Sequence, residues 1–577
     1  MAMRVKRISI EHFRSIDHVE LAFPDGKPLV LFGPNNAGKS NIIAAMHRFL
    51  GEYYPPNIAM QDSDWFMRDK ASYPFCYIGC AFDQPYAKGS NEVYVRYDPE
   101  PSGCMFQDLS GQKVYLSNSE RKAIQSFLID AERSISYQLS YSSKYTLLSK
   151  FSHAVHDALG RADKEKLGKS FEEIKSVFEG IPDYRRFADE FSGTVEDTVQ
   201  GFAHRLAVDF SAYDPNNYAN AMRILAKEGN DVRTFEEFGT GEQQVLLMAF
   251  AKAYMQVFGS ESFVLILEEP EAHLHPLAQR WLKEYIYELC ASGLQVVVST
   301  HSADFLDPGN LEGLVKVSKG DDGVTTAIQL SAKELVKQCV ESGVPAQKVS
   351  ALGIADHYAA KLAPDALKGL FAKTVLLVEG ATEYFALPTY LAKAGCSFAK
   401  ENIEIVNCGG KPSLTTYARL FSAYGIRTFC LFDCDRGKEN EELVAYLGLT
   451  ALVTQGSGFV CGNGYAYFAK DFEDTLRSQV AGYSSLENEA ANVYKVSGKP
   501  AKARVAARLC TVVPSFAVEL ANALRRIHTT SFKPNGVAAA APATYAQSFE
   551  PDYWGYEPYT QQGDPAVCPS YDDDIPF

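Results

Sequence analysis

The chain has 577 residues, of which 46% are hydrophobic, and its formal net charge is −15. This size predicts a soluble protein of two to four domains, and the absence of any apolar run near the roughly 20 residues of a membrane helix argues against a membrane protein. The acidic balance excludes a surface coated with positive charge, so any binding of nucleic acid must be local, bridged by metal or delivered by a partner.

The N-terminal segment and the cysteines indicate a cytoplasmic protein. Residues 1–7 contain basic side chains, but no apolar segment follows them, so we expect no signal peptide. The twelve cysteines are scattered and form no C-x-x-C pair. Cys290, Cys430 and Cys434 lie in apolar or motif-bearing runs, where a thiol packs as a small hydrophobic group. This usage fits a reducing cytosol and does not fit a structural zinc site.

A glycine-rich loop follows the first strand pattern, Arg4–Ile10, which we interpret as an edge-like strand. The apolar run 29–32 predicts a buried strand, and helical spacing of apolar residues begins after the loop. The loop itself reads G-P-N-N-A-G-K-S, the spacing of a phosphate-binding P-loop. Its backbone N–H groups would face phosphate oxygens, its lysine the β- and γ-phosphates, and its serine would ligate Mg²⁺. The predicted nucleotide-binding residues are Gly33, Asn35, Asn36, Gly38, Lys39 and Ser40.

The next region predicts strands and then helices. The patterns Phe75–Phe82 and Glu92–Tyr97 predict a second small sheet beside the nucleotide site. From about residue 118 to 228 apolar residues recur mostly at helical spacing, without a sustained heptad repeat, which excludes long coiled coils. We interpret this stretch as a helical insertion that serves either in packing or in dimerisation.

Three later segments supply the remaining parts of an ATP-hydrolysis site. The segment Phe238–Gln244 opens a helix. The buried strand 263–267 ends at the acid pair Glu268–Glu269, and the strand 294–300 ends at His301. Glu268 would hold Mg²⁺ through water, and Glu269 would be the base for the attacking water.

Together with the P-loop, these segments resemble the ABC-type ATPase heads of SMC, RecF and related DNA-maintenance proteins. The resemblance implies that Thr240 and Gly241 lie in a signature loop, with Thr where Ser is usual, and that His301 contacts the γ-phosphate. In such heads the signature loop caps ATP bound by the other subunit. The resemblance therefore implies a head-to-head homodimer, or a higher oligomer, formed through the ATPase heads.

After connecting helices over about 331–371, a second parallel sheet is predicted. Its strands 374–378, 403–406 and 428–432 are each apolar, and the first and third end at acids. Since open α/β sheets build their sites at the carboxyl ends of strands, these acids should lie together. A strand-end Glu and a later D-x-D resemble the Toprim fold of topoisomerases, primases and nucleases.

Oxygen ligands of this kind suit Mg²⁺ or Mn²⁺, and two such ions stabilise the attacking and leaving oxygens of a phosphodiester displacement. Glu379, Asp433 and Asp435 can supply one metal. Glu383 could hold a second metal together with Glu473, which lies in a D-h-E-D pattern. For stabilising the transition-state phosphate the sequence leaves two candidates, Lys499 and its rival Lys502.

The order of G-P-N-N-A-G-K-S, E-E-P-E-A-H-L-H-P, V-E-G-A-T-E and D-C-D resembles the OLD (overcoming lysogenisation defect) family of ATP-dependent nucleases. The resemblance implies an α/β chain with an ABC-type ATPase head with its helical insertion at 1–335, a connector at 336–372 and a Toprim nuclease domain at 373–530. It implies metal-dependent cutting of DNA and a role in phage defence; DNA repair is an alternative. A second hypothesis is an ATP-driven sensor or scaffold that cuts weakly and recruits host nucleases or helicases.

The composition changes after about residue 530, where 531–577 is predicted to be a disordered linker. Its end resembles the acidic tip of bacterial single-stranded-DNA-binding protein (SSB). The resemblance implies that SSB-interacting proteins bind the terminal ring and carboxylate in a basic-rimmed pocket. The sequence leaves open whether this tip targets partners or restrains the nuclease. The tip residues are Asp572, Asp573, Asp574, Ile575, Pro576 and Phe577.

Overall fold

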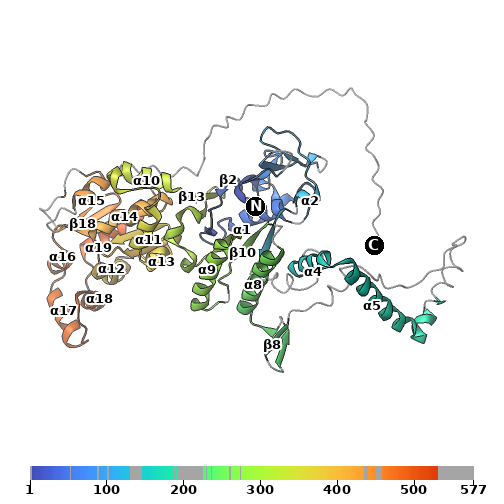
Figure 1. Ribbon diagram of the computed structural model, residues 1–577. Coiled ribbons are helices and arrows are strands. Elements are labelled where there is room, and N and C mark those ends of the chain that lie inside the picture. Colours follow the sequence, from blue (N-terminus) through green and yellow to red (C-terminus); the bar gives the residue numbers. More distant parts are fainter. Residues whose placement is uncertain are drawn as a thin grey trace. The chain divides into compact units, whose positions relative to one another are not determined.

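The structure, a computed structural model, is drawn in Figure 1. It describes residues 3–51, 53–86, 90–100, 103–121, 123–129, 146–187, 189–190, 225–228, 231–234, 237–258, 262–272, 274–434, 440–449, 452 and 458–529. Asp435 and the predicted tail, including its SSB-like tip, lie outside the described residues. Within them, no helix combines the length and hydrophobicity that crossing a membrane requires.

One mixed sheet of eleven strands forms the first part of the chain, in the order β6-β5-β4-β1-β2-β13-β12-β3-β11-β10-β7. The strands β12, β3, β11, β10 and β7 run parallel, with β3 in register between β11 and β12. The bounds are β1 (Val5–Phe13), β2 (Ile16–Ala22), β3 (Leu29–Phe32), β4 (Cys76–Phe82), β5 (Glu92–Tyr97), β6 (Met105–Gln107), β7 (Ile124–Ile129), β10 (Ser262–Glu268), β11 (Gln295–Thr300), β12 (Leu314–Lys319) and β13 (Thr325–Gln329).

Two expectations about this sheet were wrong. β1 is an interior strand between β2 and β4, whereas we expected an edge-like strand. β4 and β5 extend this same sheet through antiparallel pairing with β1 and do not form a second one. The segment 118–228, predicted to be mostly helical, also contains β7, which pairs in parallel with β10, and the strand β8 (Leu225–Glu228), which pairs with β9 (Asp231–Thr234).

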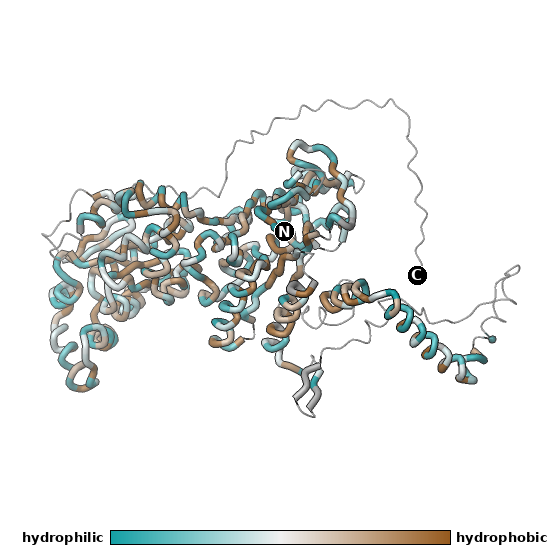
Figure 2. Tube along the Cα trace, viewed as in Figure 1, coloured by the Kyte–Doolittle hydropathy of each residue, from teal (hydrophilic) through white to brown (hydrophobic). Residues whose placement is uncertain are grey.

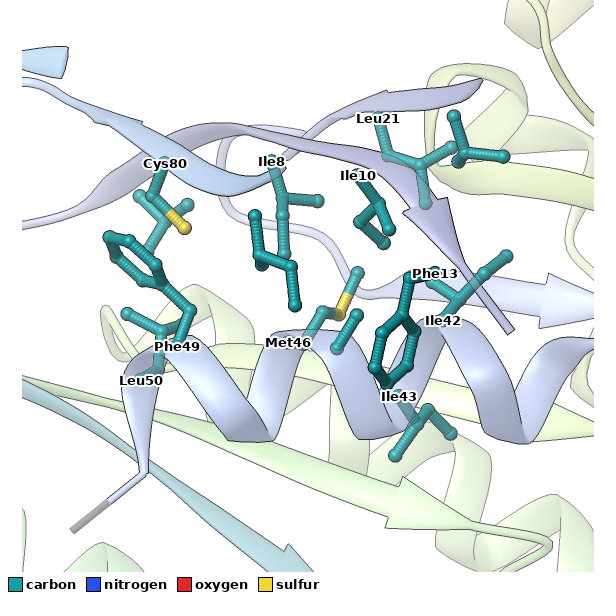
Figure 3. Packing of buried hydrophobic residues seen from close by; sticks show 14 of the residues in the cluster. Ile8, Ile10, Phe13, Leu21, Ile42, Ile43, Met46, Phe49, Leu50 and Cys80 are labelled. Carbon is teal, nitrogen blue, oxygen red and sulfur yellow. The ribbon is translucent and has the colours of Figure 1, made fainter. Parts of the chain in front are cut away.

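The helix after the P-loop, α1 (Lys39–Leu50), supplies one side of the first core (Figure 3). Ile42 and Met46 lie on the side of α1 that faces Ile8 and Ile10 of β1, Ile43 points to the opposite side of the helix, and all five side chains are buried. This periodicity matches the helical spacing of the sequence. The other helices of this part are α2 (Asn118–Arg121), α4 (Leu147–Ala158), α5 (Arg161–Glu179), α8 (Thr240–Phe258) and α9 (Pro276–Ala291).

Figure 2 shows hydrophobic and hydrophilic residues interspersed along α5. Its Ile174 is 48% exposed and its Val177 is 67% exposed. The described part of the insertion is thus mostly helical between residues 147 and 187, as predicted, and Ile174 and Val177 are exposed among the described residues.

A second sheet of five strands follows the connecting helices, in the order β15-β14-β16-β18-β17. All its pairs are parallel except β17 with β18. The three strands predicted for this sheet are confirmed, as are the connecting helices. The bounds are α10 (Ala332–Glu341), α11 (Ile354–Lys361), β14 (Thr374–Val378), α12 (Ala381–Lys393), α13 (Phe398–Glu401), β15 (Ile403–Asn407), α14 (Lys411–Ala423), β16 (Arg427–Asp433), α15 (Asn440–Leu447), β17 (Phe459–Cys461), β18 (Tyr465–Phe468), α16 (Phe472–Gln479), α17 (Tyr483–Asn492), α18 (Lys499–Leu509) and α19 (Ser515–Thr529).

A shared core joins the two sheets. Phe32, the last residue of β3, packs edge-on against Tyr424 and Phe371, with ring centroids 5.6 and 5.7 Å away. Lys316 of β12 donates a hydrogen bond from Nζ to the carbonyl oxygen of Tyr424 at 3.2 Å. The strand that leads into the P-loop is therefore in direct contact with the residue that ends α14.

Candidate functional sites

The P-loop has the backbone that its glycines predict. Gly33 and Gly38 have φ angles of 149° and 109°, in the region that favours glycine. A Cβ at Gly33 would collide with the carbonyl oxygen of Val317, and a Cβ at Gly38 would collide with the side chain of Thr325. Asn36 also has a positive φ, of 61°. Both glycines are thus required by the loop, and α1 begins directly after it.

Lys39 is buried beneath this loop. Its Nζ donates to the carbonyl oxygens of Gly33 and Pro34 at 3.0 and 3.1 Å, and it lies 2.9 Å from Nε2 of His301. Burial lowers the pKa of Lys39 to about 8, although Glu269 and other nearby carboxylates oppose that shift. A bound phosphate group would place further negative charge beside this buried ammonium.

The acid pair at the end of β10 lies close to Lys39 and to His301, which follows β11. Ser40 donates a hydrogen bond from Oγ to Oε1 of Glu268. Glu269, whose φ is 47°, places Oε1 3.0 Å from Nε2 of His301. The structure thus brings together Lys39, Ser40, Glu268, Glu269 and His301. A serine hydroxyl beside a carboxylate offers the oxygen ligands that Mg²⁺ binds.

Glu271 is a member of this site that sequence reasoning did not assign. Its Oε1 accepts hydrogen bonds from the backbone N–H of His301 and from Oγ1 of Thr300, both at 2.7 Å. These bonds fix the backbone from which the His301 ring extends. The acid lies in the E-E-P-E motif, so its position two residues after Glu269 was the available signal.

The predicted signature segment begins a helix, as expected. α8 starts at Thr240, and Glu242 accepts a hydrogen bond from the N–H of Gly239 at 3.0 Å. A Cβ at Gly241 would collide with the side chain of Leu274. The side chain of Thr240 lies outside the described residues. A contact of this loop with a second subunit stays a prediction.

The acids of the second sheet converge at the carboxyl ends of its central strands. Glu379 follows β14 and Asp433 ends β16, and these strands pair in parallel register. Oε2 of Glu379 accepts a hydrogen bond from the N–H of Asp433 at 3.2 Å. Glu383 lies in the first turn of α12, is 6% exposed, and accepts from the N–H of Gly380 at 3.1 Å. Three of the predicted acids are thus brought to one edge of the sheet.

Charge and burial distinguish this site from a solvated cluster. Burial raises the pKa of Asp433 to about 8, reinforced by the charges of Glu383, Glu379, Glu473 and Asp471. Burial likewise raises the pKa of Glu383 to about 7, with Glu473 and Glu379 adding to it. Among the described residues, Oδ1 of Asp433 is buried and has no hydrogen-bond partner. A divalent cation would neutralise these carboxylates and supply that oxygen with a ligand bond.

The described residues do not by themselves complete a metal site. No three His, Cys, Asp or Glu side chains there already stand in a ready-made metal-binding group. Asp435, which the sequence assigns to the same metal as Asp433, is not among them. The charge of Asp471, the N-cap of α16, acts on Asp433 and was not assigned from the sequence; the D-h-E-D pattern was its signal.

Of the two lysine candidates, Lys499 has the contact that bears on the choice. Its Nζ lies 3.9 Å from Oε1 of Glu473, and its side chain is 83% exposed. Lys502 lies on the next turn of α18. The buried face of this helix is formed by Ala503, Ala506 and Ala507.

The geometry defines a P-loop ATPase whose chain continues into an acidic site on a second parallel sheet. The model of the AAA ATPase domain family matches residues 3–94 and 89–306. This is more than half of the chain, so the chain belongs to that family. The model of the TOPRIM domain of overcoming lysogenization defect protein-like proteins matches residues 370–435, which include Glu379, Glu383 and Asp433.

Two related proteins are similar to this chain over 75% of its length. The OLD nuclease of Thermus scotoductus is 25% identical over 460 residues, which cover 75% of this chain and 82% of that protein. The Old nuclease of Escherichia phage P2 is 25% identical over 472 residues, which cover 75% of this chain and 78% of that protein. The chain thus joins an AAA ATPase domain to an OLD-like TOPRIM domain, as the resemblance implied.

Solved SMC heads are also similar. The SMC head domain from Thermotoga maritima is 16% identical and covers 57% of this chain and 99% of that chain, with a TM-score of 0.27. An Smc head domain with an extended coiled coil, bound to a ScpA domain derived from Pyrococcus furiosus, is 18% identical and covers 59% and 99%, with a TM-score of 0.38.

Proposed function

We propose that this protein is an ATP-regulated endonuclease that nicks or cuts DNA with divalent metal, Mg²⁺ or Mn²⁺. The observation that carries the proposal is the group of Glu379, Glu383 and Asp433, in which burial and mutual repulsion oppose ionisation. Ionised carboxylates in such a group destabilise the metal-free protein, whereas bound cations would neutralise their charge. The similarity to two OLD nucleases supports the same reaction class.

In this proposal, Glu379, Asp433 and Asp435 hold one cation, and Glu383 with Glu473 holds a second. Bound cations supply an activated water and stabilise the charge that develops on the phosphodiester oxygens. Lys499, whose ammonium lies beside Glu473, would add positive charge next to the phosphate.

The ATPase domain would bind ATP through Gly33, Asn35, Asn36, Gly38, Lys39 and Ser40. We assign Glu268 to Mg²⁺, Glu269 to the proton of the attacking water, and His301 to the γ-phosphate. The contacts of Lys39 and Ser40 with His301 and Glu268 support these roles. We further propose that two ATPase heads form a homodimer, in which Thr240 and Gly241 reach the ATP of the partner subunit.

A plasmid-nicking assay with Mg²⁺ or Mn²⁺ tests the nuclease. Asp433→Ala and Glu379→Ala should abolish cutting and leave ATP hydrolysis near wild type, because the two sites use different residues. Asp365→Ala is the matched control, since that carboxylate is 85% exposed and belongs to neither site. Equal cutting by wild type and both site variants would refute the nuclease proposal and favour the sensor or scaffold.

The remaining proposals concern the cell and the acidic tip. We propose a role in phage defence or DNA repair, with the residues Asp572–Phe577 binding proteins that normally dock on SSB. A peptide of residues 571–577 should bind such a protein, and the same peptide without Phe577 should not. Absence of binding by both peptides would end the targeting proposal.

A further inference from the structure

The segment 490–518 is basic, although the protein as a whole is acidic. It carries Lys495, Lys499, Lys502, Arg504 and Arg508 and no Asp or Glu, although the chain has a net charge of −15. Most of this charge lies on α18 (Lys499–Leu509), on which Lys499, Arg504 and Arg508 are exposed and an alanine face is buried. The charge is therefore local, which is the condition for nucleic-acid binding by a protein of this composition.

Two of these cations are held over exposed aromatic rings. The guanidinium of Arg504 lies 6.0 Å from the ring centre of Phe385, and that of Arg508 lies 5.1 Å from the ring centre of Tyr494. Phe385 is 42% exposed and Tyr494 is 41% exposed. Within the described residues, neither arginine forms a salt bridge. The rings thus orient two guanidinium groups whose charge is not neutralised by a carboxylate.

The cations Lys499, Arg504 and Arg508 form a strip along α18, and this strip begins at the acidic site. α12 and α18 lie side by side, and Lys393 near the end of α12 donates to carbonyl oxygens near the end of α18, so the two helices run in the same direction. Phe385 follows Glu383 by two residues on α12. Lys499, beside Glu473, opens α18. From Lys499 to Arg508 the helix rises about 13 Å, the length of about four nucleotides of one strand.

We propose that Arg504 and Arg508, with Phe385 and Tyr494 beneath them, bind the phosphate backbone of the DNA that enters the acidic site. The inference rests on the proposed nuclease and adds the path of its substrate. Arg504 and Arg508 lie one turn apart on one side of α18, so they would contact successive phosphates. Phosphates are favoured over an acidic peptide because the strip runs directly from the site where a phosphodiester must lie.

The test compares DNA binding by the full chain and by Arg504→Gln/Arg508→Gln, with Ca²⁺ replacing Mg²⁺, over a range of salt concentrations. Loss of two phosphate contacts should reduce the slope of log Kd against log salt by about 1.8 and weaken binding by tenfold or more at about 0.1 M salt. The charge-conserving Arg504→Lys/Arg508→Lys should retain most of the slope. Lys337→Gln/Lys368→Gln removes the same charge from exposed positions and is the matched control.

The outcomes separate this inference from the proposed function. A wild type that neither binds nor cuts DNA would refute the nuclease itself. A wild type that binds and cuts, with an unchanged affinity and salt slope in Arg504→Gln/Arg508→Gln, would refute only the strip. Tighter DNA binding by that variant would also refute it, because the strip would then hold an acidic segment such as residues 572–574.

Discussion

Replacing Asp433 by Asn should stabilise the metal-free protein. The pKa of this carboxyl rises from an ordinary value of 3.8 to about 8, first through burial and then through four neighbouring acids. A raised pKa stabilises the fold below about pH 4, and this contribution is lost as the pH rises toward 8. At about 1.4 kcal/mol for each pH unit, the full penalty above pH 8 is about 6 kcal/mol.

Neighbouring carboxylates share that penalty, and solvent relieves part of it at this half-buried residue. We therefore expect Asp433→Asn to gain about 2 to 3 kcal/mol above about pH 8, and almost nothing near pH 4. Thermal melting in chelator would measure the gain as roughly 5 to 10 °C for the transition of this domain. Asp365→Asn, at an 85% exposed position, is the control.

The same melts with Mg²⁺ or Mn²⁺ complete the experiment. Cations that bind the folded protein should raise the melting temperature of the wild type and reverse the order of the two proteins, because Asp433→Asn lacks one ligand. Equal melting temperatures for both proteins from about pH 5 to about pH 9 in chelator would refute the reasoning that ionisation of Asp433 destabilises the folded protein.

Other predictions concern the ATPase site and its link to the second sheet. Lys39→Ala should lose most nucleotide binding, measured with a fluorescent ATP analogue. Glu269→Gln should bind ATP and hydrolyse it at least a hundredfold more slowly, since it lacks the base; normal turnover would remove Glu269 from that role. Glu271→Gln should slow hydrolysis roughly tenfold at unchanged ATP affinity, because it weakens the bonds that position His301. Tyr424→Leu should reduce the difference between DNA cutting with and without ATP, and an unchanged difference would show that the shared core does not link the sites.

The carboxyl ends of the strands were the part of the fold that the sequence predicted well. Each apolar run that ended at Glu268, His301, Glu379 or Asp433 is a strand in the structure. Such runs are short, buried on both faces and bounded by polar residues, so local pattern is sufficient to locate them.

The local sequence pattern did not predict which strands pair with one another. β4 and β5 were correctly located, yet their place in the large sheet depends on pairing with β1, far away in the chain. β7 was missed because its six residues are too few for the spacing of apolar residues to distinguish a strand from a helix. Only its parallel pairing with β10 determines that it is a strand.

The candidate sites were predictable where residues follow strands and less so elsewhere. Glu379 and Asp433 could be placed together from the parallel-sheet rule alone. Glu271 was harder to assign, because its role depends on hydrogen bonds to the end of another strand. Asp471 likewise acts through its distance from Asp433, which no spacing in the sequence specifies.

The shared core gives a physical reason for an ATPase and an acidic site to occupy one chain. Phe32 precedes the P-loop glycine and packs on Tyr424, the C-cap of α14. α14 in turn packs on β14 and β16, the strands that end at Glu379 and Asp433. Because close-packed side chains transmit displacement, a shift of β3 on nucleotide binding would have to be accommodated along this route. Contact alone is not coupling, which requires that both sites bias one movable element. Tyr424→Leu, which removes the contact between the rings of Phe32 and Tyr424, tests that requirement.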